Sequence, residues 1–298
     1  MILSNAVIGG GLTGLLISVN RGYTVIEEQP HVGGVLSTFQ LDNISLTLAV
    51  PLVNTRLDFL EQYGARFRQI KFDISINKEK YFAAKICPFC DEIPDWLFPK
   101  SENMFLIENV STVLSNIEKK VHIMKDSAKI IDKKGILTKY HGLIQIEGDI
   151  INTTSIRLFL RDRGKDVSNL KYNNALLSVF ISKKKADQNF INLEGGSSTS
   201  FSHVYHINDF PSAGLSSIYV YSFFDIKDKI IDIYRLLSDL RREKILNYED
   251  IISQRSKVIS EAILYGSPEN TEDYIFEGRL GRWRNYSIEQ IVEKYSHY

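Results

Sequence analysis

The strongest constraint on the fold lies near the N-terminus, in the stretch VIGGGLTGLLISVNRGYTVIEE. A short apolar run, 6–8, leads into three glycines, and residues 12–20 have a helix-compatible pattern that stops at Arg21 and Gly22. A second β-rich run, 23–26, is followed by two acids. Strand, glycine turn, helix and strand in this order predict the opening unit of a parallel α/β sheet.

The spacing of Gly9, Gly11 and Gly14 is typical of a dinucleotide-binding turn. The first glycine permits the tight turn, the second lets a pyrophosphate approach the backbone, and the third lets helix and strand pack closely. Amides at the start of the helix then face the anion. An acid at the end of the second strand, Glu27 or Glu28, can accept hydrogen bonds from the ribose hydroxyls. The alternative is a loop in which the three glycines hold no ligand.

The remaining chain alternates between helical and strand patterns. Apolar residues at helical spacing predict helices over 54–63, 109–118, 225–242 and 286–296. Alternating or β-rich runs predict strands over 120–124, 127–132, 135–139, 142–147, 176–183, 201–207, 217–224, 257–264 and 274–277. Between 67 and 103 we expect short strands and a proline-containing loop.

Composition excludes several classes of function. The 298 residues carry 36 basic and 36 acidic side chains, so no global field attracts nucleic acid or an anionic membrane. No apolar run approaches the about 18 residues of a membrane span, and the first apolar segment leads into the glycine turn rather than a cleavage site. Two cysteines fit a reducing compartment. We therefore expect a cytoplasmic protein without a membrane span or nucleic-acid partner.

Three segments resemble one flavoprotein superfamily, that of the FAD-dependent amine oxidases, protoporphyrinogen oxidases and UDP-galactopyranose mutases. VIEEQPHVGG is similar to its second strand and glycine pair, and KKVHIMKDSAKIIDKKGILTKY followed by GLIQIEGDIINTTS to its central block. FEGRLGRWRNYSIEQIV resembles its last flavin motif, above all in the mutase-like form, although a basic cluster on the surface is the alternative interpretation. The resemblance implies FAD as the cofactor and covers about half the chain.

The resemblance also implies which residues hold the cofactor. Glu27, six residues before Gly33, corresponds to the acid that binds the ribose, and the Gly33 and Gly34 pair lies against the pyrophosphate. Gly278 and Arg279 would lie near the ribityl and pyrophosphate, while the helix that starts at Ser287 would face the ring. The full set of cofactor-binding candidates is Gly9, Gly11, Leu12, Thr13, Gly14, Glu27, Glu28, Gly33, Gly34, Val35, Ala128, Lys129, Gly278, Arg279, Ser287 and Ile288.

The chain departs from the superfamily in four respects. Only eighteen positions separate Gly9 from Glu27, so the first helix is about a turn shorter, which leaves its anion-binding start unchanged. Val35 replaces a basic or polar residue, and Asn285 replaces an aromatic one, so sugar-nucleotide specificity does not carry over. The substrate domain is reduced, which implies a small substrate, an open flavin or a partner subunit.

Cys87-Pro-Phe-Cys90 is a second chemical motif with three interpretations. A CxxC pair can be a redox dithiol that exchanges electrons with the flavin, and Lys85 is near enough in sequence to favour a thiolate. It can also be half of a zinc site, which would need His or acid ligands or a second subunit. The third interpretation is a pair that simply packs or forms a structural disulfide. We expect no metal.

Two further pairs have weaker signals. His203 and His206 are three apart, which places them on opposite faces of a strand, so they would not share a metal. Tyr219 and Tyr221 lie on one face of a predicted strand and form either an aromatic cage over a flavin or part of the packed core. Cys87, Cys90, Tyr219 and Tyr221 are the candidate catalytic residues.

These observations predict an α/β protein with an interleaved chain: a Rossmann-like FAD-binding domain and a second, smaller mixed-sheet substrate domain. We assign 1–65, 104–165 and 256–298 to the first and 66–103 and 166–255 to the second. The expected function is an FAD-dependent oxidoreductase that transfers hydride from a small organic substrate to flavin N5. The alternatives are a flavin-linked dithiol oxidoreductase and a non-catalytic FAD-binding accessory subunit. A partner subunit or homo-oligomer is compatible with each.

Overall fold

The structure is a computed structural model that describes residues 1–90, 93–210, 212, 214–225, 232–268 and 273–298. Its opening unit is the predicted one: strand β2 (Ala6–Ile8), helix α1 (Leu12–Arg21) and strand β3 (Thr24–Glu27). Gly22 ends α1 in the left-handed conformation, with φ of 69°, which a glycine adopts without steric cost. The glycine signals therefore set both ends of the first helix.

The central sheet of this unit is parallel and has the strand order β10-β3-β2-β14-β20. The added strands are β10 (Ile123–Lys125), β14 (Ile150–Asn152) and β20 (Ile275–Phe276). Numbered along the chain, this is the 3-2-1-4-5 order of a Rossmann sheet, whose order reverses between β2 and β14. Ligands bind such sheets at the carboxyl ends of the strands beside this point, which here means at Gly9.

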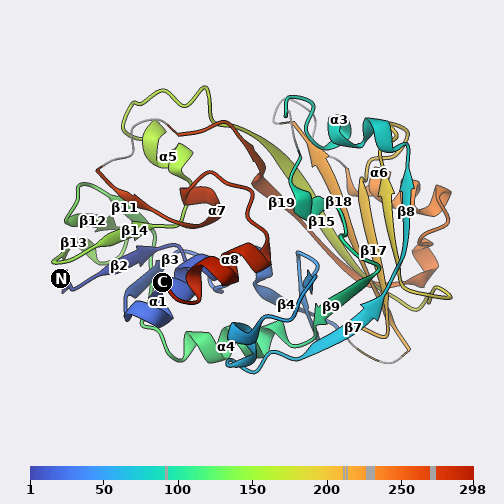
Figure 1. Cartoon of the computed structure of the whole chain (residues 1–298), viewed down its shortest axis with the longest axis horizontal. Helices are drawn as coiled ribbons and strands as arrows, with labels where there is room; N and C mark the ends of the chain where they lie inside the picture. The colour runs from blue at the N-terminus through green and yellow to red at the C-terminus, as the bar shows by residue number, and fades with distance from the viewer. Residues whose placement is uncertain (91–92, 211, 213, 226–231, 269–272) are drawn as a thin grey trace.

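Different layers cover the two faces of the parallel sheet (Figure 1). Helices α1, α4 (Val110–Glu118) and α8 (Ile288–Tyr295) pack on the face that carries Val7. A four-stranded sheet packs on the face that carries Ala6 and Ile8. Its order is β1 (Ile2–Leu3), β13 (Gly142–Ile146), β12 (Gly135–Thr138) and β11 (Ala128–Ile130). Successive side chains of a strand point to opposite faces of its sheet, so β2 packs against both layers.

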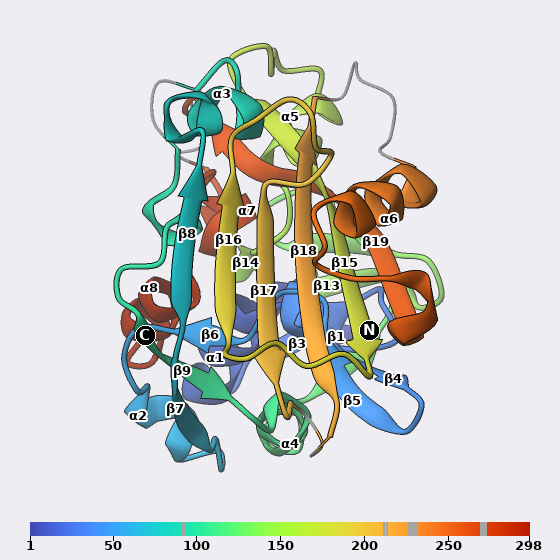
Figure 2. The ribbon, with the colours of Figure 1, turned by 90° about the vertical axis from the view of Figure 1, so that its right-hand side faces the viewer.

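A six-stranded mixed sheet forms the other side of the molecule (Figure 2). Its order is β19 (Ile251–Tyr265), β15 (Lys171–Ser182), β18 (Ser216–Phe224), β17 (His203–Asn208), β16 (Phe190–Glu194) and β8 (Asp73–Asn77). Only the pairing of β16 with β8 is parallel. Helix α6 (Ile233–Arg242) covers one face, and the other face packs toward the first unit. The chain therefore contributes in turn to the parallel sheet and to the six-stranded sheet, and the predicted α/β fold class is confirmed.

Smaller elements join the two sides. They are β4 (Thr38–Leu41), β5 (Ile44–Thr47), β6 (Leu52–Val53), β7 (Phe67–Lys71), β9 (Asn103–Ile107), α2 (Asp58–Glu61), α3 (Phe82–Ile86), α5 (Ile156–Arg161) and α7 (Gly278–Gly281). β4 pairs with β5, and β9 lies between β6 and β7. Among the residues that the structure describes, no helix is both long and apolar enough to cross a membrane.

The structure corrects several predicted boundaries. The helix expected over 54–63 is only the four residues of α2, which begins after Leu57 in extended backbone, while the Asn54 amide before it donates to Glu289 of α8. Residues 226–231 of the helix expected over 225–242 lie outside the described residues, and α6 begins at Ile233 with Asp232 as its cap. Strands β15 and β19 both begin earlier than predicted.

Candidate functional site

The glycine turn between β2 and α1 has the geometry of an anion site. Gly9 has φ of 100°, and a Cβ on Gly14 would lie 2.0 Å from the Gly9 carbonyl oxygen, so both positions require glycine. A Cβ on Gly11 would meet no atom within 4 Å. Gly11 is the N-cap of α1 and has no side chain to cap the amides of Leu12 and Thr13. The helix start therefore offers amides and open space together.

The glycine pair lies directly against this turn. The Gly33 amide donates to the Gly10 carbonyl at 2.7 Å, and Gly33 forms a parallel bridge with Gly11. A Cβ on Gly34 would lie 3.5 Å from the Gly11 Cα. Gly33 and Gly34 have φ of 102° and 61°, so the left-handed backbone favours glycine at both. Two motifs more than twenty residues apart thus form one glycine-lined surface.

Glu27 is fixed at the end of β3 and is only 8% exposed. Its two carboxylate oxygens accept hydrogen bonds from the Gly10 amide at 2.5 Å and the Gln29 amide at 2.6 Å. Each carboxylate oxygen has a second acceptor position. The arrangement fixes the carboxylate beside the glycine turn, where it can accept further donors. Glu28, the other acid, is exposed and accepts from Gln29 Nε2 at 3.3 Å.

The C-terminal motif reaches the same helix start from the far end of the chain. A Cβ on Gly278 would lie 2.8 Å from the Thr13 hydroxyl oxygen, so the motif contacts the first turn of α1. The Gly278 amide donates to the Tyr295 hydroxyl at 2.8 Å, and that hydroxyl donates to Glu277 at 2.6 Å. Glu277 also pairs with Arg282 at 2.5 Å. This buried network fixes the position of Gly278 relative to α8.

Arg279 and the start of α8 are held by neighbouring segments. Arg279 Nη1 donates to the carbonyl oxygens of Glu261 at 2.8 Å and Ala262 at 3.1 Å. Burial lowers the pKa of Arg279 to about 10, which leaves it protonated at neutral pH. Ser287 caps α8 in a capping box with Gln290, and Ile288 is the first helical residue. The predicted helix start is therefore present, with the Ser287 and Gln290 amides already bonded within the box.

The end of α8 is tied back to α1. Asn20 Nδ2 donates to the carbonyl oxygens of Tyr295 at 2.8 Å and Ser296 at 3.0 Å, and Figure 1 shows the two helices side by side. Carbonyls at a helix end lack partners inside the helix, so this contact satisfies two of them. Helices α1 and α8, whose N-terminal ends the sequence assigned to one ligand, therefore pack against each other.

A cavity of about 510 Å³ opens beyond Glu27. Its lining has both polar and apolar surface and comes from three segments of the chain: Glu28, Gln29, Pro30, Lys125, Asp126, Ser127, Lys139 and Tyr140. The predicted Ala128 begins β11 directly after this lining, and the exposed Lys129 pairs with Asp162 at 3.4 Å. Sequence reasoning missed the residues from 125–127 and 139–140. The available signals were the acid in the turn after β10 and the position of all five residues within the segment that resembles the superfamily's central block.

The aromatic candidates lie on the inner face of the six-stranded sheet. Tyr219 and Tyr221 are both buried, on the same face as Tyr205, and burial raises the pKa of all three hydroxyls. Tyr221 accepts a hydrogen bond from the Val50 amide at 2.6 Å, and the adjacent Ala49 amide donates to Val35 at 3.3 Å. Tyr221 is therefore connected through the 49–50 backbone to the residue after Gly34.

The two histidines turn to opposite faces, as strand alternation predicts. His203 is buried on the inner face, where Nε2 contacts the Leu97 carbonyl oxygen at 2.9 Å and the ring lies 5.1 Å from that of Phe82. His206 packs on the outer face against Phe190, with ring centroids 4.9 Å apart. Burial lowers the pKa of each to about 4, so both are neutral at neutral pH.

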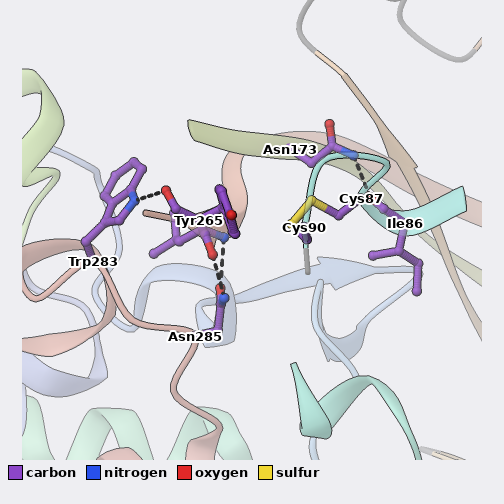
Figure 3. The surroundings of a disulfide bond; sticks show 8 residues. Ile86, Cys87, Cys90, Asn173, Tyr265, Trp283 and Asn285 are labelled. Carbon is purple, nitrogen blue, oxygen red and sulfur yellow. Dashed lines mark hydrogen bonds between the residues drawn. A yellow bond between two sulfur atoms is a disulfide. The ribbon is translucent and has the colours of Figure 1, made fainter. Parts of the chain in front are cut away.

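Cys87 and Cys90 form a disulfide bond (Figure 3). Cys87 is buried at the end of α3, where Asn173 Nδ2 donates to the preceding carbonyl of Ile86 at 2.5 Å. Lys85 does not serve the cysteines as expected, because its ammonium donates to the Gly196 carbonyl at 2.7 Å and the Thr199 hydroxyl at 2.8 Å. The bonded pair excludes a zinc site in this state.

The disulfide lies near the C-terminal motif (Figure 3). Asn285 accepts from the Leu264 amide at 2.9 Å and donates to its carbonyl at 2.7 Å, while Trp283 Nε1 donates to the Tyr265 carbonyl at 2.9 Å. Trp96, which follows the CxxC turn, donates to the Asn285 carbonyl at 3.1 Å. Both polar groups of the Asn285 side chain therefore hold β19 through Leu264.

Comparison with solved structures finds the same fold in known oxidoreductases and a mutase. Reduced UDP-galactopyranose mutase matches with a TM-score of 0.75 and 12% identity, over 98% of this chain and 92% of that chain. Putrescine oxidase bound to putrescine matches with a TM-score of 0.66 and 11% identity, over 99% and 98%. An oxidoreductase from Methanosarcina mazei matches with a TM-score of 0.65 and 12% identity, over 97% and 98%.

At these identities the likeness establishes the fold, and it is the fold that the sequence resemblance predicted. No protein-family profile and no curated protein matches the sequence. The assignment of cofactor and chemistry to this chain therefore depends on the geometry of the site.

Proposed function

We propose that this protein binds FAD and acts as an oxidoreductase that moves hydride from a small organic substrate to flavin N5. The observation that supports it most strongly is the convergence of three sequence-distant glycine motifs. Gly11, Gly33 and Gly278 lie within contact of one another or of the first turn of α1. Each position is one where a side chain would obstruct a ligand or its neighbour. A dinucleotide needs such close approach to backbone at several points along its length.

The residues present fit an FAD molecule. The uncapped amides at the start of α1 would bind the pyrophosphate, and the Glu27 carboxylate would accept the ribose hydroxyls. The start of α8 would place positive helix-dipole potential near the ring, where negative charge develops on reduction. FAD, when bound, supplies the hydride-accepting chemistry. The protein supplies position, charge stabilisation and exclusion of water.

The substrate side would be the inner face of the six-stranded sheet. We propose 1–65, 104–165 and 256–298 as the FAD-binding part and 66–103 and 166–255 as the substrate part, with β19 crossing the boundary near 256. Tyr219 and Tyr221 belong to this face, and burial keeps their hydroxyls neutral. Neutral aromatic groups suit an uncharged or amine-bearing small substrate. A cytoplasmic location and a partner subunit remain predictions.

The test is anaerobic reduction of the FAD-loaded protein by candidate substrates. Small amines, including putrescine, and other compounds with an activated C–H bond would be mixed one at a time with the loaded protein. Bleaching of the visible flavin absorbance by one class would support the oxidoreductase function and identify that class. If FAD binds but none of the compounds bleaches it while dithionite does, the accessory-subunit alternative is favoured.

The dithiol alternative has one observation in its favour. The Cys87–Cys90 disulfide lies near Asn285, which accepts a hydrogen bond from Trp96 and stands two residues before Ser287. The disulfide would accept two electrons and two protons and open to two thiols, and FAD, when bound and reduced, would supply the electrons. Under this alternative, flavin reduction would release thiols that react with a maleimide in the wild-type protein. Full turnover by a Cys90→Ser variant would exclude the dithiol mechanism.

A further inference from the structure

Tyr140 stands at the rim of the cavity beyond Glu27 and is 71% exposed. It lies in the three-residue turn between β12 and β13. A large aromatic side chain in a tight hairpin turn buries little of its apolar surface, so it contributes little to folding. The turn that carries it is nevertheless strongly fixed, which points to a role for the position of the ring.

Asp126 fixes the turn. Its buried carboxylate accepts hydrogen bonds from the amides of Lys139 at 3.0 Å, Tyr140 at 3.1 Å and His141 at 3.2 Å, and it contacts His141 Nδ1 at 2.7 Å. Burial alone would raise the pKa of Asp126, but the hydrogen bonds from His141 and the Tyr140 amide outweigh it and hold that pKa well below its usual range. The carboxylate is therefore ionised wherever the protein is folded near neutral pH.

The same residue connects the turn to the site. The Asp126 amide donates to the Glu27 carbonyl oxygen at 3.0 Å, so β3 and the Tyr140 turn share one anchor. Lys139 places its ammonium 4.9 Å from the centroid of the Tyr140 ring. A cation on one face of a ring holds the ring in place and leaves the other face for a stacking partner. Asp126 fixes the backbone of the turn and the Lys139 ammonium lies over the ring, so the ring is held at the rim of the cavity.

We infer that Tyr140 stacks on the adenine base of the nucleotide that Glu27 holds by its ribose. This inference depends on the proposed function and extends it to a residue that sets affinity for the adenosine half of the cofactor. The base must lie beyond the ribose, and the cavity of about 510 Å³ begins one residue past Glu27, at Glu28. Stacking does not distinguish one base from another, so Tyr140 would supply affinity and the polar groups of the lining would select adenine.

The experiment measures dissociation constants of FAD, AMP and FMN for the wild type and three variants by calorimetric titration. Tyr140→Ala removes the ring, Tyr140→Phe keeps it, and Tyr234→Ala removes an equally exposed tyrosine, 73% exposed, from α6. Stacking of a base on an aromatic ring predicts that Tyr140→Ala weakens FAD and AMP by about 5- to 150-fold. Tyr140→Phe and Tyr234→Ala should stay within about twofold, and FMN, which lacks adenine, should not change.

The outcomes separate the inference from the proposed function. If the wild type binds FAD and AMP and Tyr140→Ala binds both equally well, the stacking role is wrong while the cofactor assignment stands. If AMP binds and loses affinity in Tyr140→Ala but FAD does not bind, the stacking role holds and the FAD proposal is wrong. If neither ligand binds the wild type, both are wrong. Because Tyr140 is exposed, equal thermal unfolding midpoints of all variants will confirm intact folding.

Discussion

The glycine turn makes a paired prediction, in which one glycine serves the fold and another serves the ligand. In Gly14→Ala the new Cβ would lie 2.0 Å from the Gly9 carbonyl oxygen, whereas real Cβ contacts essentially never fall below 3.0 Å. Helix and turn would have to separate by about 1 Å, since both partners are backbone and no flexible side chain can yield. Overpacking of this kind costs about 1–3 kcal/mol. At about 2–4 °C per kcal/mol, the loss is visible in thermal unfolding.

Gly11→Ala should leave the stability of the fold unchanged and weaken binding of the ligand. Its Cβ meets nothing within 4 Å and its φ of −66° suits alanine. The weaker capping by alanine and the lower entropy of the unfolded chain each amount to less than about 1 kcal/mol and have opposite signs. The same Cβ would occupy the space that the pyrophosphate needs. A similar overpacking penalty in the complex predicts about 5- to 150-fold weaker FAD binding.

The assay for both variants is a thermal unfolding midpoint in the absence of FAD and a dissociation constant for FAD. The expected pattern is a lower midpoint for Gly14→Ala and an unchanged midpoint with weaker binding for Gly11→Ala. If Gly11→Ala binds FAD as tightly as the wild type, the pyrophosphate does not approach this turn. An unchanged midpoint for Gly14→Ala would refute the packing argument.

Three further predictions concern charge and cross-linking. Glu27→Gln replaces a carboxylate that accepts two amides, so we expect a loss of about 1–3 kcal/mol in the free energy of unfolding and weaker FAD binding, checked by denaturant titration and calorimetry. For Glu277, burial raises the pKa but Arg282 and Tyr295 lower it by more. Ionised Glu277 therefore stabilises the fold at pH values above its unfolded pKa of about 4.3, and this stability is lost as pH falls through the folded pKa. Tyr295→Phe should move acid unfolding, followed by circular dichroism, to higher pH; an unchanged midpoint would contradict this. Replacing both cysteines of the CxxC turn by serine opens a four-residue loop and should cost about 2 kcal/mol in denaturant unfolding.

The sequence predicted the elements whose signals are local. The glycine turn, α1 and its end at Gly22 follow from residues within one short stretch, and so do the strands of the parallel sheet. Only Asp58–Glu61 of the helix expected over 54–63 forms, and the residues before it include Asn54, which donates to Glu289, a residue distant in the sequence. The six-residue helix α5 was missed because it is too short to show a periodic pattern.

The candidate site was predictable where a residue type has one physical use. Gly9, Gly11 and Gly14 could be identified from their spacing, and Gly33, Gly34 and Gly278 from the resemblance to the superfamily; the structure brings these motifs together. The contact of Asp126 with the backbone of Tyr140 could not be predicted, because it forms only when the turn after β10 meets the turn between β12 and β13. The disulfide was one of three open interpretations, since spacing alone does not distinguish a bonded pair from a dithiol.

Titration of the purified protein with FAD, and separately with FMN, tests the central claim most directly. The convergence of Gly11, Gly33 and Gly278 at the start of α1, with Glu27 beside it, predicts one FAD per chain and much weaker binding of FMN, which lacks the adenosine that Glu27 would hold. A folded protein that shows no binding of FAD, or that binds FMN as tightly, would contradict the account.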